Sequence, residues 1–512
     1  MNSSLLRTLT IYAIILPLAV MLGWITVDLA EQDRASFAVF AGVIFVLLLP
    51  VLLKWHYMVL IFSWSSFITL FFLPGQPALW MFMALIAVGV GLLNRIVLKR
   101  PAFLSTPGVS LSLLLLAAVI LFTAWMRGGI GLSILGSSQM GGKPYIFLLG
   151  AIAGYFAFTS QAIPVEKARL CVGLFFLSGM MGIASNLIFY AGPAFYFLFL
   201  IFPSGFAGVQ ALSEMGGTGG ISRVAGFSTG ATAFIYYLMA VYGIRGLFAR
   251  WWRLGLFLAA LGLGLMGGYR SLVVLVAMYF GLLFLMEGLL RSRLFPLMIL
   301  LGALMFALLI PLAPHLPLSM QRSLTILPLE VDARVRVDAN SSLEWRLKIW
   351  RTLVPDLPKY FWLGKGYRIN PTDLYLADQA QRRGRGSHTS GAVQAGSYHS
   401  GPLTLYVPFG APGVVAFLLF LGVSLRSLYL NYRHGDEALR TINRFMFIYF
   451  VGRVIFFFTT FGDFGGELFH FTGAVGLSMA LNKGVRRPSV LAPRPVIFRD
   501  PLRGASPQPG VA

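Results

Sequence analysis

One histidine near the end of the longest polar segment is well suited to proton transfer. His399 lies in GSYHSG, residues 396–401, directly before an apolar run. Imidazole titrates near neutral pH, so this residue is a candidate general base, although a polar residue at the mouth of a helix would look the same. A second histidine, His388, lies in the Arg/Gly-rich stretch 381–391 and stays open as an alternative.

Three arginines, Arg127, Arg223 and Arg270, each lie against an apolar run. An arginine at membrane depth is costly unless it pairs, lines a watery cavity or reaches the interface. A planar guanidinium can bind two phosphate oxygens at once, so the three are candidates for an anion site. Glu214 is a candidate partner for any of them.

The elements that must position these side chains are membrane helices. Hydrophobic residues make up 57% of the 512 residues and charged residues only 11%, whereas a soluble domain carries about 25% charged residues. Apolar runs of about 20 residues recur along the chain. We therefore predict an all-α, polytopic integral membrane protein with about 14 transmembrane helices and one large extracytoplasmic loop that carries interfacial helices.

The predicted spans are joined by short loops, apart from one long polar loop. They cover residues 9–27, 36–53, 56–73, 78–97, 108–126, 145–160, 168–190, 228–244, 254–269, 271–289, 294–313, 402–425, 443–460 and 467–482. The apolar segment 192–212 is interrupted by Pro203 and Gly205 and is predicted to be re-entrant or interfacial.

These spans divide the chain into four parts. They are an N-terminal transmembrane bundle (1–314), an extracytoplasmic, periplasmic loop (315–400), C-terminal transmembrane helices (401–483) and a disordered basic cytoplasmic tail (484–512).

The distribution of Lys and Arg orients the bundle. The net charge is +22, and the basic residues of the short loops gather in one alternate set, which the positive-inside rule assigns to the cytoplasm. Both termini are therefore predicted to be cytoplasmic, and the excess charge is expected to meet membrane lipid and no nucleic acid. Arg127, Arg223 and Arg270 fall on the outer side, where this rule does not explain them.

The loop segment 341–370 has an amphipathic pattern. Arg346 and other charged residues alternate with Trp345, Trp350 and further apolar residues, which predicts a helix lying in the membrane interface.

These segments resemble the O-antigen ligase and O-antigen polymerase superfamily of bacterial envelope polysaccharide glycosyltransferases. The turn YFWLGKGY at 360–367 is similar to the family's PlfGxG-like turn, SRVAGFSTG at 222–230 to its Arg-x-x-Gly element, and GGYRSLVVL at 267–275 to its arginine before a span. His399 matches the family's histidine, although Ser400 follows where the family usually has an amide. Motifs support the resemblance over residues 220–425.

The resemblance implies a glycosyltransferase of the bacterial inner, or cytoplasmic, membrane. Such an enzyme transfers a glycan from undecaprenyl pyrophosphate to an acceptor hydroxyl on the outer side of the membrane, without a cofactor. Its partners would be the undecaprenyl-pyrophosphate-linked glycan donor, a glycan or lipid-anchored acceptor, and membrane lipid. Ligase and polymerase, which differ in the acceptor, both stay open.

The resemblance also implies roles for named residues. His399 would be the catalytic base, Arg223, Arg270 and Arg127 would bind the pyrophosphate, and Arg346, Lys365 and Tyr398 are candidates for substrate binding. No spacing typical of a metal site is present.

The competing class is a transporter or flippase of lipid-linked glycans, which would carry ionisable groups near the middle of the membrane. Arg453 is the one charge predicted well inside a span, which favours the enzyme. The enzyme hypothesis requires Arg223, Arg270 and His399 to converge on one outer cavity.

Overall fold

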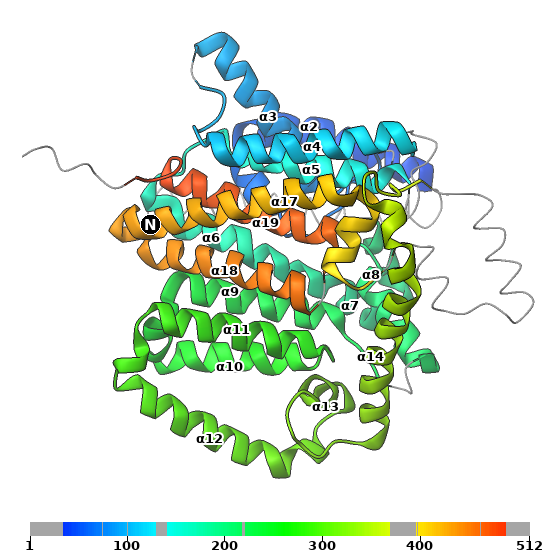
Figure 1. Ribbon diagram of the computed structural model, residues 1–512, viewed down its shortest axis with the longest axis vertical. Coiled ribbons are helices and arrows are strands. Elements are labelled where there is room, and N and C mark those ends of the chain that lie inside the picture. The colour runs from blue at the N-terminus through cyan, green and yellow to red at the C-terminus, as the bar shows by residue number, and fades with distance from the viewer. Residues whose placement is uncertain are drawn as a thin grey trace, which may run out of the picture.

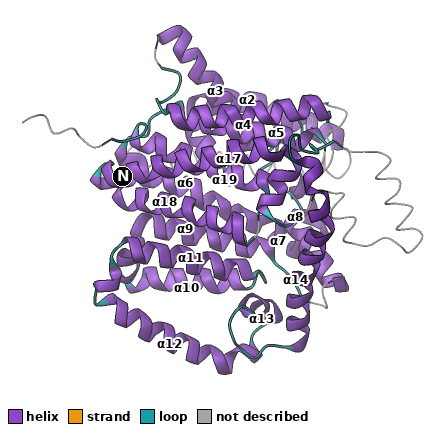
Figure 2. Ribbon diagram, viewed as in Figure 1, coloured by secondary structure: helices purple, strands orange, loops and turns teal. Residues whose placement is uncertain are grey.

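The computed structural model describes residues 34–73, 75–99, 101–129, 141–217, 221–368, 396, 398–460 and 462–487. Across these residues the chain folds into helices joined by loops (Figure 2). An isolated β-bridge between Thr69 and Ala78 is the one pairing of extended segments recorded in this part of the chain. The prediction of an all-α fold is confirmed for it.

Twelve helices of 15 residues or more carry the architecture. They are α2 (Arg34–Ser63), α3 (Leu79–Leu98), α4 (Pro107–Arg127), α5 (Gly142–Thr159), α9 (Ala225–Phe248), α10 (Trp251–Leu265), α11 (Arg270–Met286), α12 (Leu294–Leu312), α14 (Ala333–Leu353), α17 (Gly401–His434), α18 (Arg440–Thr459) and α19 (Phe464–Asn482). Four shorter α-helices are α6 (Ala168–Leu177), α7 (Gly182–Ala191), α8 (Gly205–Leu212) and α13 (Leu318–Leu324).

Seven helical stretches within the described residues are long and apolar enough to cross a membrane. They are Leu79–Leu98, Pro107–Arg127, Val165–Ala191, Ala225–Phe248, Leu294–His315, Gly401–His434 and Glu437–Thr459, while α10 and α11 are shorter apolar helices. The chain therefore has the makeup of a multi-pass membrane protein. The predicted span 9–27 and most of the predicted tail, 488–512, lie outside the described residues.

The prediction of two spans at 36–53 and 56–73 is wrong. One helix, α2, runs from Arg34 to Ser63, and an irregular segment follows it up to α3. The polar residues Lys54 and His56 suggested a loop, but neither breaks a helix, and the long side chain of Lys54 is exposed on the helix surface.

One predicted span is confirmed, and one further predicted segment is interrupted. The stretch Val165–Ala191 covers the predicted span at 168–190 and is long and apolar enough to cross a membrane, with a 3₁₀ turn, Ser178–Met181, between α6 and α7. The segment 192–212 forms a 3₁₀ helix, Pro193–Leu200, followed by α8, each of eight residues. Such lengths are too short to cross a bilayer, which needs about 20 residues.

Most long helices lie side by side, and α14 runs across them near one end (Figure 1). Ion pairs and hydrogen bonds fix this placement, because α14 contacts Arg223 just before α9 and Arg270 at the start of α11. Helix α12 has no buried residues and lies apart from the other long helices in Figure 1. The end of the bundle under α14 is where the candidate side chains gather.

Next to the candidate side chains, helix α5 packs tightly against helix α19. The Trp64 indole stacks on Phe469 with ring centroids 4.5 Å apart. Gly154 of α5 and Gly473 of α19 leave room for this ring, since a Cβ atom at either position would come within 2.1 Å of it. Both helices begin at the same end, so their N-terminal residues line one pocket.

Candidate functional site

Helix α14 is the element that brings most of the candidate residues together. It begins after Asp332, whose side chain accepts a hydrogen bond from the Arg334 backbone N–H at 2.8 Å and so caps the helix. Val335, Ala339 and Ile349 are buried on the face toward the bundle. The amphipathic helix predicted from residue 341 is therefore present, but it starts earlier, at Ala333.

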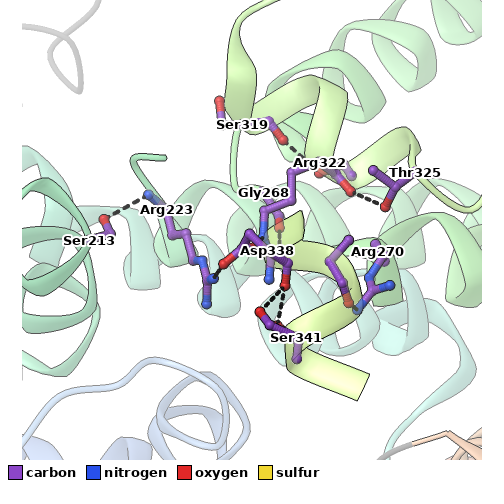
Figure 3. A network of polar contacts seen from close by, with 12 residues as sticks. Ser213, Arg223, Gly268, Arg270, Ser319, Arg322, Thr325, Asp338 and Ser341 are labelled. Carbon is purple, nitrogen blue, oxygen red and sulfur yellow. Dashed lines mark hydrogen bonds and ion pairs between the residues drawn. The ribbon is translucent and has the colours of Figure 1, made fainter. Parts of the chain in front are cut away.

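Three arginines lie near Asp338 and Ala339 of this helix, and we call them the arginine cluster: Arg223, Arg270 and Arg322 (Figure 3). Arg223 Nη2 donates to Asp338 Oδ1 at 2.7 Å, and Arg322 Nε donates to Asp338 Oδ2 at 2.5 Å. Arg270 Nη2 donates to the carbonyl oxygen of Ala339 at 3.2 Å. The predicted pair Arg223 and Arg270 is thus brought to one helix, together with an arginine that the sequence reasoning missed.

The arginine cluster carries more positive than negative charge. Within the described residues, Asp338 is the one carboxylate in an ion pair with these arginines. Glu214, a predicted partner, instead accepts hydrogen bonds from Gln210 and Ser222. Two like charges about 6 Å apart repel by about 3 kcal/mol at an effective dielectric constant of about 20, so a bound anion would relieve a real cost.

Burial makes this excess charge more costly. Burial, and then the neighbouring charge of Arg322, lower the pKa of Arg223 from its ordinary value. Arginine still stays protonated at any physiological pH. The Arg223 Nε atom is buried and has no hydrogen-bond partner within the described residues. The cluster can therefore offer several N–H donors and net positive charge to a phosphate-like ligand.

His399 lies just before α17 and packs against a later part of α14. Its ring meets the Trp345 ring edge-to-face, with centroids 4.9 Å apart, and Trp350 Nε1 donates to the carbonyl oxygen of Tyr398 at 2.9 Å. The backbone of His399 has φ +49°, in the left-handed region that non-glycine residues rarely adopt. Such conformations persist where the surroundings impose them, often at functional sites.

The charge state of His399 favours a base. Burial, and then the positive charge of Arg346, lower the pKa of His399 from its usual value. The imidazole is therefore neutral at neutral pH and can accept a proton. Arg346 also lies within electrostatic reach of Arg270, so it links the histidine to the arginine cluster.

Arg127 lies at a different place from the other predicted arginines. Its Nε donates to the carbonyl of Gly364 at 2.8 Å and its Nη2 to that of Leu363 at 3.0 Å. These bonds hold the turn 360–367 against the end of α4. The predicted grouping of Arg127 with Arg223 and Arg270 is not reflected in shared contacts.

Lys365 and Tyr398 line a separate pocket of about 210 Å³, which we call the lysine pocket. Its other polar walls are Lys143, Asp463 and Thr404, with Gly366 and Gly396 among the remaining residues. Tyr398 directly precedes His399, so the pocket lies next to the segment that carries the candidate base. His388, the alternative base, falls outside the described residues.

Sequence reasoning missed Arg322 and Asp338. Arg127, Arg223 and Arg270 stand out because they lie against apolar runs, whereas Arg322 lies in the polar segment SMQRSL. Asp338 is 115 residues from Arg223, and no periodicity links the two. An acidic and a basic residue that belong to no common helix cannot be paired from sequence alone.

Arg453, predicted to be the lone charge inside a span, has an acidic partner. Its Nη1 donates to Glu467 Oε1 at 2.8 Å, and both side chains are largely buried. Glu467 belongs to the first turn of α19, which starts at Phe464 and buries this side chain in the bundle. A cavity of about 470 Å³ is lined by Arg453, His470 and Tyr449.

Among the described residues, no group of three or more His, Cys, Asp or Glu side chains is arranged to hold a metal ion. The chain matches no protein-family model and no curated protein.

Proposed function

We propose that the protein is a membrane glycosyltransferase of the O-antigen ligase or polymerase type. It would transfer a glycan from undecaprenyl pyrophosphate to an acceptor hydroxyl on the outer side of a bacterial inner membrane. The observation that carries this proposal is that one helix, α14, gathers three arginines at Asp338 and Ala339 and packs its Trp345 against the ring of His399.

The arginine cluster suits the pyrophosphate of the donor. Guanidinium groups bind phosphate oxygens bidentately and remain charged in a partly buried site. As the glycosidic bond breaks, negative charge grows on the leaving phosphate oxygen, and fixed donors stabilise that charge in the transition state. In this proposal Asp338 partly neutralises the arginines while no donor is bound.

His399 suits the acceptor side of the reaction. The acceptor oxygen attacks the anomeric carbon of the donor sugar, and its proton passes to the neutral imidazole. The bond from that carbon to the phosphate oxygen breaks, and its electron pair leaves with the lipid pyrophosphate. No metal and no further reactant is needed to balance this step.

The test uses the full-length protein in liposomes with an undecaprenyl-pyrophosphate-linked glycan and a set of candidate acceptors. Wild type should transfer the glycan, and His399→Ala should lower the turnover about 10²–10⁴-fold, as loss of a general base does. The donor KM should change little, because His399 is assigned to the acceptor.

A matched control is His434→Ala. His434 is exposed at the last residue of α17, and His399 lies just before its first residue. The two are therefore separated by about 50 Å of helix, and the control should keep full activity. Transfer that survives His399→Ala would contradict the assigned base. Movement of the intact donor across the bilayer without transfer would favour the transporter class, to which the buried Arg453–Glu467 pair would then belong.

A further inference from the structure

The lysine pocket has no assigned ligand, although it adjoins the candidate base. Lys143 comes from the first turn of α5, Lys365 from the turn 360–367, and Asp463 from the start of α19. Three segments far apart in sequence therefore place charged groups around one space. Pockets for drug-sized ligands measure about 300–1,000 Å³, so a pocket of about 210 Å³ fits a smaller group, such as one sugar residue.

The charges around this pocket favour an anion. Lys143 lies at the N-terminal end of α5, where a positive side chain opposes the helix dipole, and no acidic residue lies in that first turn. The N-terminal end of α19 faces the same pocket through Gly465 and Gly466. The uncapped end of α5 and two lysines thus face one space opposite a single carboxylate, Asp463, which caps α19.

The backbone around Lys365 is held firmly. Its N–H donates to the carbonyl of Val407 at 2.7 Å, and the next N–H, of Gly366, donates to that of Pro408 at 3.0 Å. Gly364 lies so close to Pro408 that a Cβ atom would come within 2.0 Å of its carbonyl oxygen. Together with the two bonds from Arg127, these contacts fix the position of the Lys365 backbone.

Asp463 is fixed as well, because its Oδ2 accepts a hydrogen bond from the Gly466 N–H at 3.0 Å. A carboxylate accepts hydrogen bonds only, so it suits the hydroxyl groups of a sugar. The lysines supply donors to an oxyanion at the other side of the pocket.

We propose that the lysine pocket binds an acceptor sugar that carries an oxyanion, either a phosphate or a carboxylate. Tyr398 forms part of its wall and is bonded to His399, so a sugar held here has its hydroxyl groups beside the segment that carries the base. The role of this sugar as the acceptor rests on the proposed function. The binding of an oxyanion-bearing sugar in the lysine pocket does not depend on that function.

The first experiment measures binding alone. Methyl glucoside 6-phosphate, methyl glucuronide and neutral methyl glucoside are titrated by calorimetry into the full-length protein in nanodiscs. A charged sugar should bind at least about tenfold more tightly than the neutral one, and Lys143→Ala or Lys365→Ala should each remove about that factor. Preference between the first two sugars identifies the phosphate or the carboxylate as the oxyanion.

The matched control is Lys359→Ala, which removes an exposed lysine of the same loop that pairs with Asp356. It should leave all three affinities unchanged. Equal binding of the three sugars, no binding of any, or an equal loss in the control overturns the proposal.

The second experiment uses the same sugars as acceptors and water as the competing acceptor. Lys143→Ala should lower transfer to the charged sugar but leave hydrolysis of the donor unchanged. If wild type neither transfers nor hydrolyses the donor, the proposed function fails. The calorimetric result still decides whether the lysine pocket binds an oxyanion-bearing sugar. If the enzyme transfers and the lysine variants do not distinguish the sugars, only the pocket assignment fails.

Discussion

Arginine is used in two different ways in this molecule. Arg453 and Glu467 form a one-to-one pair buried in the bundle, with a single hydrogen bond of 2.8 Å between them. In the arginine cluster, Arg223 and Arg322 share the one carboxylate of Asp338, and Arg270 donates to the neighbouring carbonyl oxygen of Ala339. The first arrangement is balanced, and the second leaves positive charge unmatched.

The two arrangements differ in net charge and therefore in whether a bound anion would stabilise them. A balanced buried pair carries no net charge, and removal of one partner leaves the other uncompensated in an apolar environment. An unbalanced cluster is costly without a ligand, because its arginines repel one another. Unmatched charge beside α14 therefore indicates a binding site, whereas matched charge inside the bundle indicates a structural role.

The largest expected effect tests the balanced pair. Arg453→Leu leaves the buried carboxylate of Glu467 without its partner, which should destabilise the protein by about 3–5 kcal/mol. Unfolding of the purified protein by increasing SDS, followed by tryptophan fluorescence, measures the loss. The double variant Arg453→Met with Glu467→Leu should recover most of the stability. An Arg453→Leu variant as stable as wild type would mean that the pair is not structural.

A smaller effect, of opposite sign, is expected at Asp338 in the arginine cluster. Asp338→Asn removes the carboxylate that competes with a bound anion for Arg223 and Arg322. Binding of a polyprenyl pyrophosphate should become tighter by about 1 kcal/mol, or about fivefold, while the unliganded protein becomes less stable. Calorimetry with farnesyl pyrophosphate measures the first change. Weaker binding in Asp338→Asn would indicate that the carboxylate positions the arginines and does not compete with the ligand.

The smallest expected effect concerns pH. His399 must be neutral to act as a base, so the rate falls as pH drops through its pKa, which burial and then Arg346 lower. Arg346→Gln removes one of these causes and raises that pKa. The acidic limb of the kcat profile should therefore move to higher pH by about 0.5–1 unit. The measurement uses a saturating donor concentration, so that donor binding does not affect the rate. Arg334→Gln, on the same helix as Arg346, should show the wild-type profile.

Several long helices and two arginines of the cluster could be predicted from the sequence, because both depend on local apolar patterns. The spans at 78–97 and 108–126 match α3 and α4, because each is one uninterrupted apolar run between polar ends. Arg223 and Arg270 stood out because each lies at the end of such a run. α2 was split incorrectly because polar residues inside a helix look like a loop.

The contacts that define the site depend on distance in space and not on local pattern. Asp338 meets Arg322 from 16 residues away and Arg223 from 115. Glu467 meets Arg453 across 14 residues and a turn between two helices. Only the folded chain reveals that Arg453 has a carboxylate of its own, whereas Arg223 and Arg322 share the carboxylate of Asp338.

The most direct test of the account is whether the arginine cluster binds a pyrophosphate. Farnesyl pyrophosphate, a short and soluble polyprenyl pyrophosphate, is titrated into wild type, Arg270→Gln and Arg334→Gln, all in nanodiscs. Arg334 is exposed on the same helix and paired with Asp332, so it is a matched control for charge. The account predicts binding that weakens at least about tenfold in Arg270→Gln and stays unchanged in Arg334→Gln. Equal affinity in all three proteins would contradict the central claim that the unmatched arginines form an anion site.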